Sequence, residues 1–129
     1  MKIDIRFTDT DAQKNVNHTA IVEWIAHARV KMLDKYAELS DINDLDHVLV
    51  SLNMNFSGKI FWPGEVEITG FVSEVGSKSV KTEFYVTDKD GTDLADAECV
   101  NVFFITYSGK SIIIPEEFKS LLLSGKISA

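Results

Sequence analysis

Residues 18 to 36 limit most strongly what this chain can fold into. The stretch predicts one long helix from about His18 to Tyr36, and Asn17 is its expected N-cap because the Asn17 side-chain oxygen can accept a free amide of the first turn. At about 100° per residue, its polar stripe covers an arc of only about 80°. The stripe consists of Glu23, His27, Lys31 and Asp34.

Most of the remaining surface of this helix is apolar. It carries Ala20, Ile21, Val22, Trp24, Ile25, Ala26, Ala28, Val30, Met32, Leu33 and Tyr36. A helix that is apolar around so much of its circumference is normally buried on several sides. We therefore expect a sheet that curves around it.

The segments on either side of the helix supply the strands. Ile3, Ile5 and Phe7 alternate with polar residues and predict a short first strand with one buried face. After the helix, residues 47–56 place apolar side chains at every second position, which predicts a strand with one apolar face. That face consists of Val48, Val50, Leu52, Met54 and Phe56.

Three further strands are expected within residues 65–75, 80–88 and 94–107. They are separated by turns at 76–79 and 89–92, the second with the hairpin signal Asp90-Gly91.

The end of the chain, residues 114–125, predicts a short helix with Pro115 near its first position and Gly125 as its stop. The resulting order is a strand, a long helix, four antiparallel strands and a final helix. This order is typical of the α+β class. The 129 residues fit a single domain, 1–129. The first strand and the strand at 47–56 are both expected at sheet edges, and a regular edge strand favours pairing with a second subunit.

The composition excludes several classes of function. Thirteen Lys and Arg against 20 Asp and Glu give a net charge of −7, which is unfavourable for nucleic acid, whose phosphates need basic patches. No apolar run suits a signal peptide or a membrane span, so the expected location is the cytoplasm. Cys99 is the one cysteine, which rules out an internal disulfide and offers no metal cluster. No cofactor and no metal are expected.

Residues 9 to 18 have the composition of a site rather than of a plain connection. Two aspartates, Asp9 and Asp11, are followed by an asparagine pair and then by His18 at the start of the long apolar helix. The pattern Asp9-Thr10-Asp11, a short spacer and Asn17-His18 resembles the active-site segment of the 4-hydroxybenzoyl-CoA thioesterase branch of acyl-CoA thioesterases. The similarity continues through Ala28-Arg29, residues 64–91 and residues 112–118, and so covers nearly the whole chain.

The resemblance implies the hotdog fold, in which a curved antiparallel sheet of about five strands wraps one long helix. It also implies that Asp11 is the catalytic carboxylate and that His18 works beside it. The chain departs from the family pattern at three positions: Phe7 stands where some members have a tyrosine, and Gln13 and Lys14 stand where glycines are usual.

The chemistry of thioester hydrolysis agrees with these residue types. An alkyl thiol has a pKa of about 8.5, so it leaves as thiolate with little help from an acid, and no Ser-centred motif is needed. Asp11 could attack the carbonyl or act as base for a water, and the sequence leaves both roles open, with a slight preference for the base. The free amides at His18 and Thr19 are expected to stabilise the oxyanion.

The expected substrate contacts are Asn17, Thr19, Ile21 and Trp24 around the acyl group, and Lys78 at the CoA phosphates. Three of them have a simpler structural interpretation. Asn17 is mainly a cap, Trp24 a core residue, and Lys78 a solvated turn lysine.

The remaining polar candidates are interpreted structurally. Asp9 is read as a loop stabiliser whose oxygens accept backbone amides, and His27 as part of a solvated face. His47 has no expected partner for a metal site, and Cys99 is interpreted as an inert residue of the core packing.

The predicted function is hydrolysis of an acyl-CoA thioester to free acid and CoA by a homodimer or homotetramer. Two alternatives remain open. One is a thioesterase acting on acyl-carrier proteins, although such acidic partners would be repelled by the net charge. The other is a non-catalytic acyl-CoA-binding module with the same fold. A hotdog dehydratase would need a different arrangement of a His and an acid.

Overall fold

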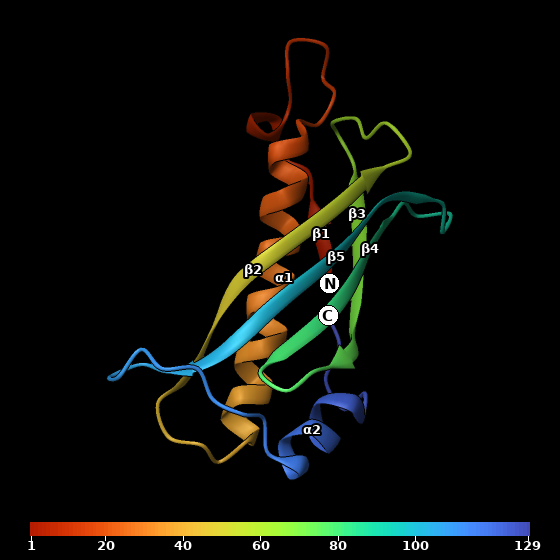
Figure 1. Ribbon diagram of the computed structural model, residues 1–129. Coiled ribbons are helices and arrows are strands. Elements are labelled where there is room, and N and C mark those ends of the chain that lie inside the picture. Colours follow the sequence, from red (N-terminus) through yellow and green to blue (C-terminus); the bar gives the residue numbers. More distant parts are fainter.

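The computed structural model describes all 129 residues, which form five strands, two α-helices and a short 3-10 helix (Figure 1). Their bounds in chain order are β1 Lys2–Asp4, η1 Phe7–Asp9, α1 His18–Leu39, β2 Leu45–Phe56, β3 Glu65–Val75, β4 Ser79–Thr87, β5 Asp93–Ile105 and α2 Glu116–Leu123. The predicted order of elements is confirmed.

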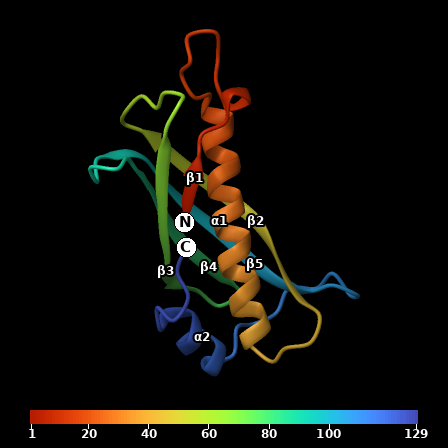
Figure 2. The ribbon, with the colours of Figure 1, turned by 180° about the vertical axis from the view of Figure 1, so that it is seen from behind.

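The five strands form one antiparallel sheet in the order β1-β3-β4-β5-β2. The sheet curls around α1, which lies along its inner face, while α2 closes the end farthest from the start of α1 (Figures 1 and 2). This is the α+β hotdog fold that the sequence led us to expect. Both predicted edge strands, β1 and β2, lie at the edges of the sheet.

The face of α1 that points to the sheet is buried, but Val22 and Ala26 are half-buried and Val30 is 41% exposed, so the expected burial on several sides is only partly met within this chain. Its buried residues are Ala20, Ile21, Trp24, Ile25, Ala28, Arg29, Met32, Leu33 and Tyr36. They join the inner residues of the strands in one core cluster of 24 residues. The helix runs three residues beyond the expected end and stops at Ser40, whose hydroxyl donates to the Ala37 carbonyl at 2.6 Å. Neither α1 nor α2 has the length and hydropathy that crossing a membrane requires.

The first strand is shorter than its alternation suggests. Ile5 is buried, but β1 ends at Asp4, and Phe7 begins η1 with its side chain 62% exposed. The chain turns here because the Asp9 carboxylate accepts the Arg6 main-chain N–H at 2.8 Å. The expected strand position of Phe7 is therefore wrong, and its ring packs edge-on against Trp62, with ring centroids 5.2 Å apart.

A bulge in β2 divides the apolar face predicted for residues 48–56. The register with β5 shifts between Leu49 and Ser51, which places Val50 in the bulge. Leu52 pairs with buried Cys99 on the side that faces the helix, whereas Val48 pairs with Val102 on the outer side. Because one extra residue reverses the facing of a strand, the five apolar residues do not share one face.

The turns and the last helix follow the predictions closely. Gly91 and Gly125 both adopt positive φ, 81° and 70°, at the expected hairpin and helix stop. Pro115 is the N-cap of α2, one position before the first helical residue.

His47 has partners that the sequence did not predict. Its Nε2 lies 2.8 Å from Asp34 Oδ1 on α1, and its Nδ1 lies 3.1 Å from the Asn101 Nδ2 on β5. Asp34, Asp46 and His47 bring three possible metal-ligand atoms within 4.8 Å of one another. Both ring nitrogens of His47 are, however, already hydrogen-bonded, which fits a structural link between α1 and the sheet.

Candidate functional site

The candidate site lies at the loop between η1 and α1. Thr10 and Val16 form an antiparallel bridge, and Asn15 forms another with Phe61 in the β2–β3 connection. At the tip, the Asp11 N–H donates to the Asn15 carbonyl at 2.8 Å, and Lys14 adopts a φ of 64°. Lys14 thus takes the left-handed conformation for which glycine is the usual residue.

The Asp11 carboxylate is fixed by its own loop. Asp11 is exposed, and its Oδ1 accepts the N–H groups of Gln13 at 2.9 Å and Asn15 at 3.1 Å. These are its only hydrogen bonds to the protein, so Oδ2 is available to a substrate or a water. The loop therefore presents a carboxylate oxygen in a defined orientation.

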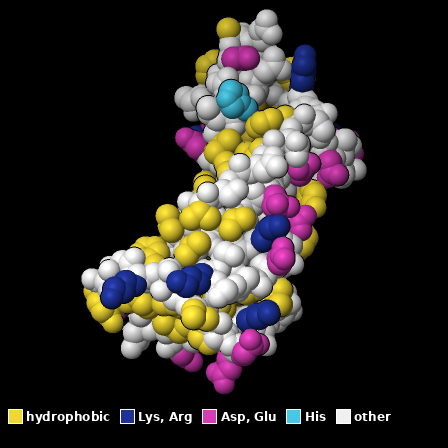
Figure 3. All heavy atoms as spheres, in the orientation of Figure 1, with side chains coloured by type: hydrophobic (Ala, Val, Ile, Leu, Met, Phe, Trp, Pro, Cys, Tyr) yellow, Lys and Arg dark blue, Asp and Glu magenta, His cyan; other side chains and the backbone are white.

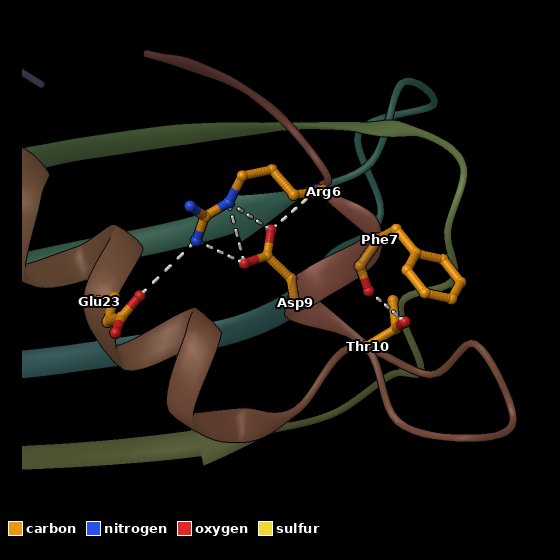
Figure 4. Close-up of polar contacts among 5 residues, drawn as sticks. All are labelled: Arg6, Phe7, Asp9, Thr10 and Glu23. Carbon is orange, nitrogen blue, oxygen red and sulfur yellow. Dashed lines mark hydrogen bonds and ion pairs between the residues drawn. The ribbon is translucent and has the colours of Figure 1, made fainter.

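Asp9 is the buried aspartate of the pair and holds the base of the loop (Figure 4). Besides the Arg6 main-chain N–H, it accepts the Arg6 guanidinium, with Nη2 2.8 Å from Oδ1. Burial alone would raise the pKa of Asp9, but the hydrogen bonds and charge of Arg6 outweigh it and hold the pKa below its ordinary value. Since the Asp9 carbonyl also accepts the Asn17 N–H at 2.9 Å, Asp9 joins the loop to the start of α1. Its predicted role as a loop stabiliser is confirmed.

The first two main-chain amides of α1 are free, whereas the Ala20 N–H donates to the Asn17 carbonyl at 3.0 Å. Asn17 occupies the N-cap position with extended backbone, but its side chain makes no capping hydrogen bond, which corrects the expected role. The main-chain N–H groups of His18 and Thr19 therefore have no side-chain partner. Together with the helix dipole, they form a site that favours negative charge.

A groove of about 280 Å³ begins at this end of α1. It is lined by Asn15, Val16, His18, Ile21, Phe56, Gly58, Lys59 and Ile60. The His18 ring lies edge-on to Phe56, with centroids 6.2 Å apart, and the Val16 N–H donates to the Ile60 carbonyl at 2.8 Å. The groove therefore runs between the helix, the end of β2 and the connection that follows it.

Of the predicted site residues, the structure brings His18 and Ile21 together in the groove. Asn17 and Thr19 are exposed at the helix start beside it, and Asp11 lies on the adjoining loop, outside the groove lining. Trp24 is buried and contributes to a different hollow, next to Arg6 and Glu23.

Lys78 lies far from this groove within one chain. It is in the β3–β4 turn, which lies beside α2 (Figure 1). Its ammonium donates to Ser111 Oγ at 3.3 Å. α1 separates the two ends of the molecule by about 33 Å, from 22 residues at about 1.5 Å each. A contact of Lys78 with a substrate in the groove would therefore have to come from a second subunit.

Three groove residues on and after β2 were not predicted as site residues: Phe56, Gly58 and Ile60. Phe56 was placed only in a strand face, and no periodic pattern marks residues 57–64. The bridge from Asn15 to Phe61 and the Val16–Ile60 hydrogen bond bring this connection to the helix. Those contacts depend on the tertiary fold.

Comparisons with known proteins point in one direction. The family model described as the thioesterase-like superfamily matches residues 5–122. A search of curated proteins found no match.

Among solved structures, DHNA-CoA thioesterase from Staphylococcus aureus is similar with a TM-score of 0.74 and 19% identity, over 88% of this chain and 78% of that one. The 1,4-dihydroxy-2-naphthoyl-CoA thioesterase Slr0204 from Synechocystis gives a TM-score of 0.76 and 12% identity, over 95% of this chain and 93% of that one. The PA5185 protein from Pseudomonas aeruginosa is similar with a TM-score of 0.80 and 22% identity, over 95% of this chain and 87% of that one. At these identities the structural likeness establishes the fold.

Proposed function

Because the chain belongs to the thioesterase-like superfamily, we propose that it hydrolyses acyl-CoA thioesters to a free carboxylic acid and CoA. The observation that carries the proposal is an apolar groove that starts at the free amides of α1, next to a loop that presents Asp11. Two of the similar structures are named as thioesterases of an aromatic acyl-CoA, which agrees with a CoA substrate.

In the proposed mechanism the acyl group lies in the groove against Ile21, and the thioester carbonyl points to the main-chain N–H groups of His18 and Thr19. These amides and the helix dipole stabilise the oxyanion, and loss of one such donor typically costs about 3 kcal/mol of transition-state stabilisation. The His18 side chain orients the carbonyl or the water, together with the Asn17 side chain, which makes no capping hydrogen bond.

The free oxygen of Asp11 deprotonates the attacking water, and CoA leaves as thiolate. Direct attack by Asp11 would form an anhydride and remains the alternative. Both routes need the same carboxylate.

We further propose that the active form is at least a dimer, joined along β2. This edge strand presents unpaired backbone groups and exposed apolar side chains at Val50, Leu52 and Phe56. Phe56 also lines the groove, so a second subunit on this edge would cover one side of the site.

The test is thiol release from a panel of short, long, branched and aromatic acyl-CoAs. Asp11→Asn should lower kcat/KM by about 100-fold or more, which is the usual effect of removing a general base. Asp88→Asn is the matched control, because Asp88 Oδ1 accepts two main-chain N–H groups in the same pattern, from Asp90 and Thr92. Near-full activity in folded Asp11→Asn would refute the assignment.

The two alternatives give different results in the same assays. A carrier-protein thioesterase would turn over acyl-carrier proteins faster than the matching acyl-CoAs. A non-catalytic module would bind acyl-CoA and release no thiol. The glycine positions held by Gln13 and Lys14 and the missing hydroxyl at Phe7 are the features that favour the module.

A further inference from the structure

Lys59 is a cation inside an otherwise uncharged groove. Apart from the His18 imidazole, the other lining residues carry no ionisable group, and four of the eight are hydrophobic. The ion pairs of the structure involve Lys2, Lys81, Arg6, His47 and the N-terminus, so the Lys59 ammonium is unpaired.

Neighbouring cations are already engaged. Arg6 is bound to Asp9, with Nη2 2.8 Å from Oδ1, and Lys14 lies over the ring of Trp62, 5.8 Å from its centroid. Asp11, on the adjoining loop, lies outside the groove lining, and its Oδ1 is held by the amides of that loop. Lys59 is therefore the positive charge that a ligand in the groove would meet.

The groove is also shallow. Its floor residues Ile21 and Ile60 are 5% and 6% exposed, and Ile25, one helical turn below Ile21, is completely buried. Ile25 therefore closes the groove along the helix within this chain, which favours a short acyl group. A polar group at its far end then remains close to the rim, where Lys59 is exposed.

We propose that the groove selects a short acyl group with a negative charge, and that Lys59 determines this selection. An anion against apolar walls loses hydration and needs a charged donor in return, which Lys59 supplies. The inference rests on the proposed function, since it names the acyl class for that same site.

The experiment compares size-matched acyl-CoAs that differ in one charge: malonyl-CoA with 3-methylbutyryl-CoA, and 4-carboxybenzoyl-CoA with 4-isopropylbenzoyl-CoA. The measured quantity is the ratio of kcat/KM for the anionic member to that for the neutral member. Because both members carry CoA, contacts with the CoA phosphates cancel in the ratio. Lys59→Met should lower the ratio about tenfold, and Lys59→Arg should largely retain it.

Lys78→Met is the matched control, because Lys78 is equally a surface lysine but lies at the other end of the chain. Its ratio should equal that of the wild type, even if a partner subunit brings Lys78 to the CoA. An unchanged ratio in Lys59→Met, or an equal fall in Lys78→Met, would overturn the proposal.

Non-hydrolysable thioether analogues of the same four compounds separate this inference from the proposed function. Their dissociation constants, measured by calorimetry, report charge selection without turnover. Absence of thiol release from every substrate would refute the hydrolase, while a Lys59-dependent binding ratio would still support anion selection. Equal binding of charged and neutral analogues would refute anion selection even in an active enzyme.

Discussion

At the scale of single residues, the two aspartates of one short motif have different surroundings. Asp9 is buried against Arg6, whereas Asp11 is exposed and bonded to the amides of its own turn. The sequence predicted that one stabilises the loop, but it could not identify Arg6 as the partner. That pairing depends on the 3-10 turn at Phe7–Asp9. The turn was not predicted, because apolar and polar residues alternate through Phe7 and indicate a strand.

Replacing Asp9 by asparagine should destabilise the protein by about 1–3 kcal/mol near neutral pH, since a buried charge-assisted pair is lost. Folding lowers the pKa of Asp9, so its stabilisation is complete above the unfolded value of about 3.9 and disappears as the pH falls through the lower, folded value. The difference in the free energy of unfolding between wild type and Asp9→Asn should therefore shrink on acidification. Urea unfolding at about pH 7 and about pH 2 measures it.

The control for Asp9 is Glu23→Gln. Glu23 lies 3.9 Å from Arg6 but is exposed, and such a pair contributes at most about 1 kcal/mol. If the loss of unfolding free energy in Asp9→Asn were independent of pH, the packing of the side chain, and not its charge, would explain the effect.

Lys14 gives a second prediction at this scale. Its φ of 64° is unfavourable for any residue with a Cβ, so Lys14→Gly should be more stable than Lys14→Ala by about 1 kcal/mol. Both variants lose the contact with Trp62, and the comparison therefore isolates the backbone. Thermal unfolding of the pair checks it, and a more stable alanine variant would contradict it.

At the scale of elements, α1 was the most predictable part of the chain. Its apolar circumference predicted both the helix and the sheet around it, because burial on several sides leaves few other arrangements. The bulge at Val50 was not predictable, since it is created by pairing with β5 rather than by any pattern within residues 45–56. A period-two pattern shows that a strand exists and does not show where its facing reverses.

The packing of β3 against β4 depends on a single glycine. A Cβ on Gly70 would lie 2.2 Å from Phe84 Cδ1, and Phe84 is completely buried. Gly70→Ala should therefore destabilise the fold by about 1–3 kcal/mol through overpacking. Phe84→Leu in the same chain should recover part of the loss, because the two changes share one contact.

The readout for Gly70 is a double-mutant cycle from denaturant unfolding. Strictly additive effects of Gly70→Ala and Phe84→Leu would mean that the ring moves aside at no cost and that the glycine is not required for packing.

At the scale of the whole molecule, the order of elements, the hotdog fold and both edge strands could be predicted from the sequence. The groove could not, because it is assembled from three segments: residues 15–21 across the start of α1, Phe56 at the end of β2, and residues 58–60. Apolar side chains collect over β2 and β5 on the outer face of the sheet (Figure 3). The single-domain organisation and the oligomeric state stay predictions.

The last prediction concerns the β2 edge. Val50 lies in the bulge of β2 and is 57% exposed, so Val50→Lys places a charge on an apolar edge and should weaken association between subunits. Sedimentation should show a dimer or larger form for the wild type and a concentration-dependent shift to monomer for the variant. Ile113→Lys is the control, because Ile113 is 69% exposed but lies outside β2, and this variant should remain associated.

Activity distinguishes two roles of the β2 edge. If a second subunit covers the groove at Phe56, Val50→Lys should lose thiol release in parallel with the dimer and recover it at high protein concentration. A wild-type chain that sediments as a monomer while fully active would refute the proposed dimer and leave the groove complete in one subunit.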